Sequence, residues 1–598
     1  MGVILRASLP LCVAALVATA VVADQDALRR DVDYLASDAL EGRLTGTEGA
    51  RAAAAHLSAE LEALGAMPMP GQESFEIPFE FTAGTNDTGS SVTVGDRVFS
   101  GTDTVQALSF SDSDTVGGGV VFAGYGLQLP ETQDFPYDSY AGLDVEGKIV
   151  VILRYFPEDV EQETRQILAR YSGLRYKARA AREGGALALL VVTGPRSPNA
   201  GETIAMTFDT AVSGSDLIAA SASGEVADAI FEHVADQDLE ATQKSLDDGN
   251  PHVTGFDIPG LEISLTTSVV RERREGFNVA GYLPGETEGL DKPWVVLGAH
   301  YDHLGRGGGG NSLAGKDEKN DVHHGADDNA SGTAAVLDAA RTLTSQSRQR
   351  SIAIAFWSGE ELGLLGATAF IKDEVLPSDA MAAYINLDMV GRSRDNKMTL
   401  QAIGSSSVWP GLVERTNVPI GFDLSLADDP YLPTDSAAFN LASIPTLNLF
   451  TGSHEDYHRP SDTAEKLDYE SLDMVSRFAA QVTRRVANLD TAPDFIKVAP
   501  KRQEGGDRDT VRAFTGTIPD YATEVVGLLL SGVIEGGPAD EAGIMAGDVI
   551  VEFAGQSIAN IYDYTYALDA VKVDVTVDVV VMREGERVEL KLTPRARD

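Results

Sequence analysis

The chain has 598 residues, enough for roughly four domains at about 150 residues each. Apolar residues make up 43% and charged residues 23%, a globular composition that excludes a disordered or fibrous chain. Lys plus Arg number 47 against 91 Asp plus Glu, giving a net charge of −44. So acidic a surface argues against non-specific nucleic-acid binding and against docking on anionic lipid, since both need basic clusters.

Residues 1–23 are predicted to be a secretory signal peptide. Arg6 precedes an apolar run over 9–23 that ends in the small residue Ala23, as such signals require. The run is too short to span a membrane, and no later run is long enough. We therefore expect an exported protein without a membrane span, either periplasmic or secreted.

The cysteine content excludes several kinds of site from the mature chain. Cys12, the one cysteine, lies inside the predicted signal peptide. The mature chain would then lack disulfides, thiolate metal sites and a cysteine nucleophile.

Residues 24–105 are predicted to begin with a helix and to continue in short strands. Leucines recur at helical spacing in 48–64, and Gly65 follows where a helix C-cap belongs. Short alternating runs between turn residues over 71–105 indicate strands or hairpins.

Residues 106–275 have a different sequence pattern from the segments on either side. They are predicted to form a separate module, either β-rich or α/β. Buried strands are expected at 147–154 and 186–192, with a helical stretch over 162–183 between them. This region holds no dense group of metal-ligand residues, so we expect no chemistry of its own.

Residues 276–490 are predicted to alternate between strands and helices. Helical stretches such as 331–345 alternate with four buried strands, expected at 294–299, 352–356, 383–387 and 444–450. This alternation predicts an α/β fold with a mixed, mostly parallel sheet and helices on both faces. In such sheets, ligands bind beyond the carboxyl ends of the strands.

The C-terminal part is predicted to be a separate small unit. Residues 491–511 hold two prolines and a charged, glycine-bearing run, which is typical of a linker. Residues 512–598 are rich in valine and read as short strands.

Potential metal ligands gather in residues 276–490. Six of the nine histidines lie in it: His300, His303, His323, His324, His454 and His458. Acidic residues follow the same predicted strands or open a helix: Asp302, Asp327, Asp328, Glu360, Glu361 and Asp388. Any one of them could be a helix cap or an ordinary loop residue. Together, at successive strand ends, they predict a site at one edge of the sheet.

These residue types suit a pair of zinc ions. Zinc binds imidazole nitrogen and carboxylate oxygen, and a catalytic site leaves one position open. Two zinc ions about 3.5–4 Å apart with one shared carboxylate need two histidines and three acids. A further carboxylate must remain free of metal to move protons. The cluster supplies this set and leaves Asp302 to orient His300.

Five ordered motifs carry a resemblance to secreted di-zinc aminopeptidases, whose superfamily includes glutamate carboxypeptidase, glutaminyl cyclase and the transferrin receptor ectodomain. The motifs are GAHYDHLG (298–305), GADDNASGTAAVL (325–337), FWSGEELGLLGA (356–367), NLDMVGR (386–392) and TGSHEDYHRPSDT (451–463). The segment YLASDALEGRLTG (34–46) resembles the opening of the same domain. The resemblance implies a zinc exopeptidase fold, with residues 24–105 and 276–490 as the two parts of the catalytic domain.

The resemblance also implies a role for each matching residue. His300 and Asp388 would bind one zinc, Glu361 and His458 the other, and Asp328 would bridge the two. Three further residues would act beside the metals: Glu360 as general base and acid, Asp302 as the partner of His300, and Tyr457 as a hydrogen-bond donor to the oxyanion.

The two remaining modules resemble known domains as well. GGGVVFAGYGL, GKIVVILR and AREGGALALLVV make 106–275 similar to a protease-associated domain inserted into the catalytic domain. Residues 531–558 resemble the central run of a bacterial PDZ domain, a β-barrel-like fold. Phe514, Thr515 and Gly516 lie where its carboxylate-binding loop belongs, although Thr515 replaces the usual leucine, and the resemblance implies peptide C-termini as partners. A docking role without a free peptide stays open.

The expected activity is release of N-terminal residues from peptides, because carboxylates beside the metals suit a substrate ammonium group. A carboxypeptidase remains an alternative, since Arg392 and Arg394 follow the Asp388 motif and could bind a terminal carboxylate. Glutaminyl cyclase is disfavoured because its single-zinc site does not use the full ligand set. A catalytically idle peptide-binding scaffold is the alternative from another class.

Overall fold

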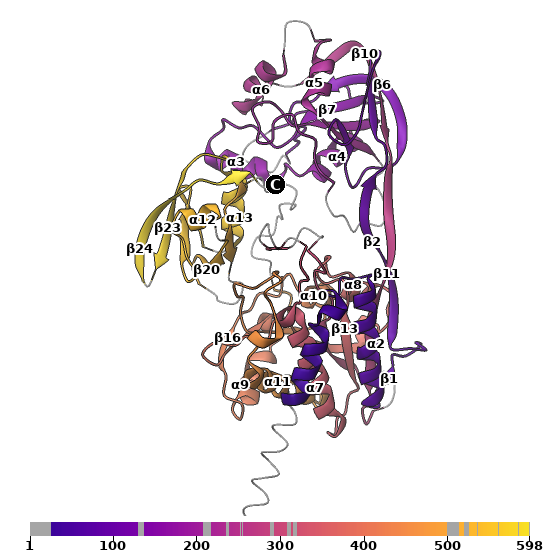
Figure 1. Ribbon diagram of the computed structural model, residues 1–598, viewed down its shortest axis with the longest axis vertical. Helices are drawn as coiled ribbons and strands as arrows, with labels where there is room; N and C mark the ends of the chain where they lie inside the picture. The colour runs from indigo at the N-terminus through magenta and orange to yellow at the C-terminus, as the bar shows by residue number, and fades with distance from the viewer. Residues whose placement is uncertain are drawn as a thin grey trace, which may run out of the picture. The chain divides into compact units, whose positions relative to one another are not determined.

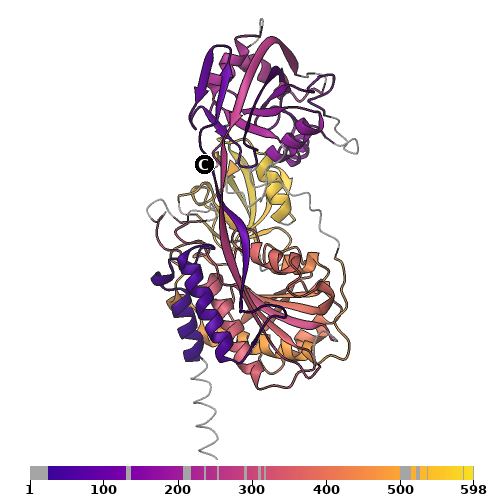
Figure 2. The same cartoon turned by 90° about the vertical axis from the view of Figure 1, so that its right-hand side faces the viewer.

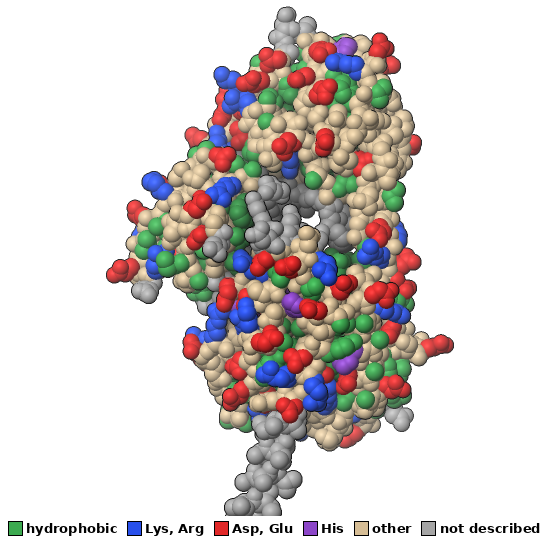
Figure 3. Space-filling model, viewed as in Figure 1, with side chains coloured by type: hydrophobic (Ala, Val, Ile, Leu, Met, Phe, Trp, Pro, Cys, Tyr) green, Lys and Arg blue, Asp and Glu red, His purple; other side chains and the backbone are tan. Residues whose placement is uncertain are grey.

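The computed structural model describes residues 25–596 except 130–136, 207–216, 235–237, 252, 254, 288–291, 308–311, 315–317, 319, 499–512, 520–524, 535, 560 and 584. The predicted signal peptide and most of the predicted linker lie outside the described residues. None of the described helices is both long and apolar enough to cross a membrane. Figure 3 shows acidic side chains spread over one face of the molecule, interspersed with Lys and Arg.

The chain divides into two compact units. The first runs to Glu80 and resumes from Arg274 to Lys501, and the second holds Phe81–Arg273 together with the C-terminal region. The division therefore falls earlier than the boundary expected between residues 105 and 106. Hairpin patterns do not reveal which sheet a strand will join, and the strands over 91–107 pair in the sheet of the second unit.

The first unit is built on one sheet with strand order β1-β11-β13-β12-β14-β17-β15-β16, and β2 pairs with β11. Its centre is formed by four parallel strands: β13 (Ile352–Trp357), β12 (Trp294–His300), β14 (Met381–Leu387) and β17 (Thr446–Phe450). These bounds confirm the four predicted buried strands. The outer strands are β1 (Met67–Pro68), β2 (Glu76–Asp87), β11 (Val269–Leu283), β15 (Lys397–Gln401) and β16 (Asp423–Leu426).

Helices cover both faces of this sheet, as predicted (Figures 1 and 2). Side chains alternate along β12: Val295 and Leu297 enter one apolar core, while Trp294 and Val296 enter another. The first core is closed by α2 (Glu48–Ala63), α7 (Gly332–Thr344), α9 (Trp409–Asn417) and α11 (Tyr469–Ala487). The second is closed by α8 (Leu365–Lys372) and α10 (Ser436–Leu441). Both faces of the parallel strands are therefore buried, which leaves the strand ends to carry polar residues.

The inserted module of the second unit has an eight-stranded sheet, ordered β4-β3-β10-β6-β7-β8-β9-β5. Its four parallel strands are β6 (Asp114–Phe122), β7 (Ile149–Leu153), β8 (Ala188–Val192) and β9 (Ile218–Ala222). The other strands are β3 (Ser91–Val94), β4 (Arg97–Ser100), β5 (Val105–Ala107) and β10 (Phe256–Thr267). The identity of this module as a protease-associated domain stays a prediction.

The helices of the module differ from the expectation at one place. The predicted helical stretch over 162–183 is split into α3 (Gln162–Arg170) and α4 (Leu174–Glu183). Gly173 has an extended ψ of 136° and caps α4, so the first helix cannot continue through it. Two further helices are α5 (Gly224–Phe231) and α6 (Leu239–Asp247).

The C-terminal domain has a six-stranded sheet, ordered β19-β20-β21-β23-β24 with β22 beside β21, and a small sheet of β18 and β25. Its elements are β18 (Ala513–Phe514), β19 (Thr517–Pro519), β20 (Leu528–Val533), α12 (Pro538–Glu541), β21 (Val549–Phe553), β22 (Gln556–Ser557), α13 (Ile561–Ala570), β23 (Val577–Arg583), β24 (Glu586–Leu592) and β25 (Arg595–Ala596).

Candidate metal centre

The candidate ligands meet where the four central strands of the first unit end. His300 is the last residue of β12, and Asp388 directly follows β14. Glu360 and Glu361 follow β13 after a turn at Gly359, whose φ is +79°. His458 lies in the loop after β17. Because the four strands are parallel, their carboxyl ends lie at one edge and bring these side chains together.

Asp328 reaches the site from the turn that precedes α7. It lies in the π-type turn η2 (Ala326–Ser331), where its φ of −108° and ψ of 93° are not helical. The buried Asp462 carboxylate accepts hydrogen bonds from the backbone N–H groups of Asp327 and Asp328 at 2.9 and 3.1 Å. Asn329 Nδ2 donates to Leu387 O at 2.9 Å. These bonds fix the turn beside the end of β14.

Asp328 divides its two carboxylate oxygens between two histidines. Oδ1 lies 3.3 Å from His300 Nε2, and Oδ2 lies 3.3 Å from His458 Nε2. His300 Nε2 is also 3.4 Å from Asp388 Oδ1, and His458 Nε2 is 3.1 Å from Glu361 Oε2. Two atoms bound tetrahedrally to one zinc at 2.0–2.2 Å lie about 3.3–3.6 Å apart. The spacing of these nitrogen and oxygen donors therefore fits two adjacent zinc positions with Asp328 between them.

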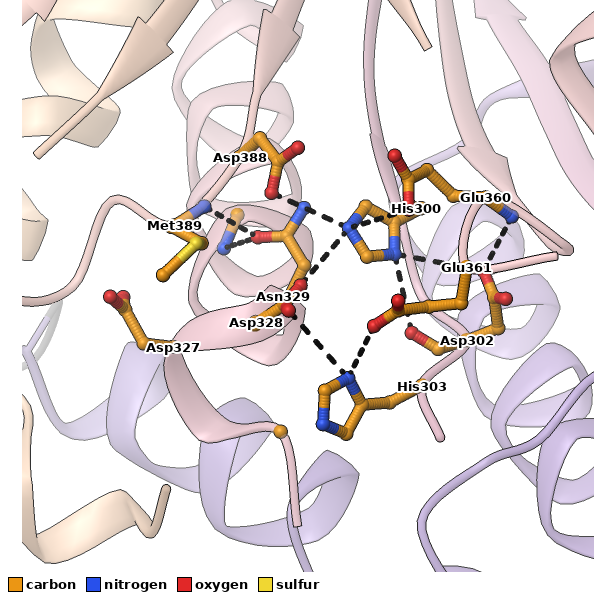
Figure 4. Close-up of polar contacts among 12 residues, drawn as sticks. His300, Asp302, His303, Asp327, Asp328, Asn329, Glu360, Glu361, Asp388 and Met389 are labelled. Carbon is orange, nitrogen blue, oxygen red and sulfur yellow. Dashed lines mark hydrogen bonds and ion pairs between the residues drawn. The ribbon is translucent and has the colours of Figure 1, made fainter. Parts of the chain in front are cut away.

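Glu360 has a different position from the ligand candidates. Its Oε2 lies 4.0 Å from His300 Nε2, farther than the oxygens of Asp328 and Asp388. Its backbone N–H donates to Asp302 Oδ1 at 3.2 Å, which anchors the turn after β13. Figure 4 shows His300 surrounded by Asp328, Asp388 and Glu360. Among the described residues, His300, Glu360 and Asp388 form one group of donors close enough for a metal ion, and His303, Asp328 and Glu361 form another.

The two neighbouring glutamates differ in their electrostatics. Burial raises the pKa of Glu360 well above its usual value, and the charges of Asp388 and Glu361 add to this against the opposing effect of His300. Burial also raises the pKa of Glu361, but the His458 charge and hydrogen bonds from two histidines outweigh it and bring that pKa to about 2. Glu361 is thus suited to bind a cation, and Glu360 to hold a proton.

The carboxylate of Asp328 is also held in its charged form. Burial raises the pKa of Asp328, but hydrogen bonds from His300 and His458 lower it well below its usual value. Asp388, the carboxylate that faces His300, differs in this respect: burial outweighs the effect of His300, and the pKa of Asp388 is raised. So many buried acids beside one another are costly without a compensating cation, which is a second reason why the residues fit a metal pair.

Asp302 contacts His300 mainly through its backbone. His300 Nδ1 lies 3.2 Å from the carbonyl oxygen of Asp302 and 3.6 Å from its Oδ1. The carboxylate instead accepts hydrogen bonds from Thr45 Oγ1 at 3.0 Å and from the Glu360 N–H. Asp302 therefore connects the end of β12 to the turn that carries the candidate base.

Tyr457 lies against one of the candidate ligands. Its ring stacks on that of His458 with a centroid distance of 3.8 Å and an interplanar angle of 22°. It packs beside Met389 and Phe450. This contact restrains the ring of His458, whose backbone has a φ of +55°.

The structure adds a residue that the sequence interpretation did not single out. Arg43 is fully buried, and its guanidinium donates to the carbonyl oxygens of Tyr301, His324 and Gly325 at 2.7, 2.7 and 2.9 Å. Burial lowers its pKa to about 10, although nearby carboxylates oppose the shift. It ties the end of β12 to the turn before Asp328. Arg43 lies in the segment 34–46, which resembles the opening of the catalytic domain, but the sequence assigned no role to any residue of that segment.

Two further residues near the site had no role assigned to them from the sequence: His303 was noted only as one of six clustered histidines, and Asp435 was not noted. His303 is fully buried, and its Nδ1 lies 2.7 Å from Glu361 Oε1. Asp435 is fully buried at the start of α10, and neither of its carboxylate oxygens has a hydrogen-bond partner among the described residues. Burial and the charges of Asp302 and Asp388 raise the pKa of Asp435 well above its usual value, against the effect of His300. Asp435 had no signal, because it follows an irregular loop rather than a strand.

Comparison with known proteins finds family models that match two parts of the chain. Residues 278–483 match Peptidase family M28, and residues 502–593 match the PDZ domain. "Leucine aminopeptidase 2" of Trichophyton rubrum is 24% identical over 295 residues, which cover 44% of this chain and 54% of that protein. "Aminopeptidase YwaD" of Bacillus subtilis (strain 168) is 30% identical over 185 residues, which cover 29% of this chain and 40% of that protein. The chain thus spans about half the length of the first of these relatives and 40% of the length of the second.

Among solved structures, the "Aminopeptidase from Aneurinibacillus sp. strain AM-1" aligns with a TM-score of 0.46 and 17% identity, over 80% of this chain and 96% of that one. "BSAP, a zinc aminopeptidase from Bacillus subtilis" aligns with a TM-score of 0.43 and 20% identity, over 81% and 98%. The chain contains a Peptidase family M28 domain and, at its C-terminal end, a PDZ domain.

Proposed function

We propose that this chain is an exported di-zinc aminopeptidase. The observation that carries the proposal is the division of the Asp328 oxygens, each 3.3 Å from a different histidine. His300 and Asp388 would hold one zinc, Glu361 and His458 the other, and Asp328 would be shared. The names of similar proteins, leucine aminopeptidase and zinc aminopeptidase, support the same activity.

The chain's own residues would then perform the proton transfers. Zinc held by these residues would supply Lewis-acid chemistry, which polarises a peptide carbonyl and lowers the pKa of water. Glu360, which lies beside the ligands with a raised pKa, would accept the proton of the attacking water and deliver it to the departing amine nitrogen. Tyr457 would donate a hydrogen bond to the oxyanion. Asp302 would keep Glu360 in place through the N–H of its backbone.

The arginines that favoured a carboxypeptidase are already paired with acids. Arg392 Nη1 lies 3.1 Å from Asp456 Oδ2, and Arg394 Nη2 lies 3.2 Å from Glu455 Oε2. A guanidinium neutralised in this way is a poor receptor for a substrate carboxylate. The surplus of carboxylates around His300 and His458 instead suits a substrate ammonium group, which favours cleavage at the N-terminus.

The proposal extends to export and to the PDZ domain. Export rests on the signal-like run over 1–23. Gly516, with a φ of +74°, follows Thr515 in the loop that would capture a peptide C-terminus. Thr515 itself is buried, and its hydroxyl lies 2.9 Å from that of Tyr564, so the backbone of the loop would bind the carboxylate.

Cleavage of amino-acid amides tests the proposed activity. The full chain would be assayed with each amide both free and N-acetylated, and with peptides carrying a free C-terminus. We expect cleavage only where the amine is free. Cleavage restricted to N-blocked peptides with a free carboxylate would favour a carboxypeptidase. Absence of cleavage by zinc-loaded protein would favour a peptide-binding scaffold.

A further inference from the structure

His303 contacts the metal-binding face of the site without belonging to the ligand set inferred above. Its ring is fully buried, and Nδ1 lies 2.7 Å from Glu361 Oε1 and 3.8 Å from Asp328 Oδ2. The other oxygen of Glu361, Oε2, lies 3.1 Å from His458 Nε2. The two oxygens of Glu361 therefore have different partners, one on each side of the carboxylate.

The short distance identifies a hydrogen bond rather than two ligands of one metal. Tetrahedral zinc ligands are separated by about 3.3–3.6 Å, as the other donor pairs in this site nearly are. A separation of 2.7 Å is instead the length of a charge-assisted N–H···O bond. An ionised carboxylate only accepts hydrogen bonds, and the pKa of Glu361 is lowered to about 2, so His303 Nδ1 is the donor in this bond.

The surroundings hold the ring in this orientation. Gly325, with a φ of +55°, lies so close that a Cβ at this position would be 2.5 Å from two ring atoms of His303. The carbonyl of Gly325 is in turn bound by Arg43. The remaining ring nitrogen, Nε2, points away from the carboxylates (Figure 4). It is buried and has no hydrogen-bond partner among the described residues. Only the Nδ1 side of the ring thus engages the site.

We propose that His303 is a positioning residue for the second metal. By donating its Nδ1 proton to Glu361 Oε1, it keeps Oε2 directed toward His458 and so prepares the site before the metal arrives. This inference rests on the proposed di-zinc function. Outer partners of this kind usually contribute 10–100-fold in metal affinity, so its loss should weaken one of the two metals by about that factor.

Two amide substitutions distinguish the roles of the two ring nitrogens of His303. In His303→Asn the side-chain NH2 can replace the Nδ1–H donor, whereas in His303→Gln the longer side chain places its NH2 near the Nε2 position. His303→Leu removes both donors. His56→Asn on α2 is a matched histidine control away from the site. Zinc content is measured after dialysis against graded chelator, with the absorption of the cobalt-substituted protein as a second readout and thermal unfolding as a folding check.

We expect wild type, His56→Asn and His303→Asn to retain two metals at similar chelator concentrations. His303→Gln and His303→Leu should lose one metal at about 10–100-fold lower chelator concentration. Two equally tight metals in folded His303→Leu would overturn the positioning role while leaving the proposed function intact. Equal loss in His303→Asn and His303→Leu would also overturn it. Fewer than two metals in wild type would contradict the proposed function itself.

Discussion

The two α/β sheets of this chain share a layout but differ in chemistry. In each, four adjacent parallel strands end at a common edge, β13-β12-β14-β17 in the first unit and β6-β7-β8-β9 in the inserted module. Both groups of donors suited to a metal, among the residues that the structure describes, lie at the edge in the first unit. The parallel edge alone therefore does not make a metal site.

Polar residues also lie at the strand-end edge of the inserted module, but they form hydrogen bonds with one another. Asp247, fully buried at the end of α6, accepts hydrogen bonds from Tyr125 Oη and Arg196 Nε, both at 2.6 Å. The Glu158 N–H adds a third bond at 3.2 Å. These three partners follow β6, β8 and β7, respectively. One acid surrounded by donors is already neutralised and has no oxygen left for a cation.

In the first unit, buried acids outnumber the donors that could neutralise them. Four acids (Asp328, Glu360, Glu361 and Asp388) converge with histidines, and Arg43, the nearby guanidinium, is occupied by backbone carbonyl oxygens. An excess of buried carboxylates over cationic donors is what distinguishes a metal-binding edge from a structural one. The following substitutions test this contrast.

The largest effect is expected for Asp328→Ala. Loss of both oxygens removes the shared ligand, so zinc content should fall below two per chain and amide cleavage should fall to background. Metal analysis combined with turnover measures this. Retention of two tightly bound zinc ions in folded protein would show that the bridge has been placed on the wrong residue.

The second expected effect is on chemistry without loss of metal. Glu360→Gln removes the proton acceptor while leaving the ligands, so kcat should fall by about 10²–10⁴-fold with zinc content unchanged. Glu361→Gln is the matched neighbouring substitution, and it should release one zinc. Turnover close to wild type in Glu360→Gln would refute the assignment of the base.

The third effect should appear in stability alone. Asp247→Asn weakens charge-assisted bonds from Tyr125 and Arg196, each worth about 1.5–3 kcal/mol. Hydrogen exchange should therefore accelerate in β6, β7 and β8, while zinc content and turnover stay within about twofold of wild type. A loss of zinc from this variant would remove the distinction between the two edges.

The smallest effect is expected for Thr45→Val. It removes the hydroxyl that donates to Asp302 Oδ2 at 3.0 Å, a bond worth about 0.5–1.5 kcal/mol. If that energy positions Glu360, kcat should fall by up to about tenfold with KM little changed. Steady-state kinetics of this variant beside Thr47→Val, a helix-cap change on α2, would show whether the effect is specific to Asp302.

The sequence predicted the ligand candidates because strand ends can be located from hydrophobic runs. His300 and Asp388 sit at the ends of β12 and β14, so a correct strand assignment was sufficient to bring them together. The local helix over 48–64 was equally readable and appears as α2, Glu48–Ala63. Hydrophobic periodicity thus predicted the main strands and helices, whereas the order of the strands in the sheet was not predicted.

What could not be predicted depends on contacts between distant segments. Arg43 binds carbonyl oxygens some 260–280 positions away along the chain, and no periodic pattern encodes such a contact. His303 was visible as one of six clustered histidines, but its bond to Glu361 depends on the path of the loop after β12. The strands over 91–107 were recognisable as strands, yet their membership of the second sheet is decided by pairing with β10 and β9.

The most direct test of the account is the zinc content of the purified full chain, determined by elemental analysis against protein concentration after dialysis in metal-free buffer. The division of the Asp328 oxygens between His300 and His458 predicts two zinc ions per chain. A value of one, or of zero after zinc has been offered in excess, would contradict the shared-carboxylate centre on which the proposed activity rests.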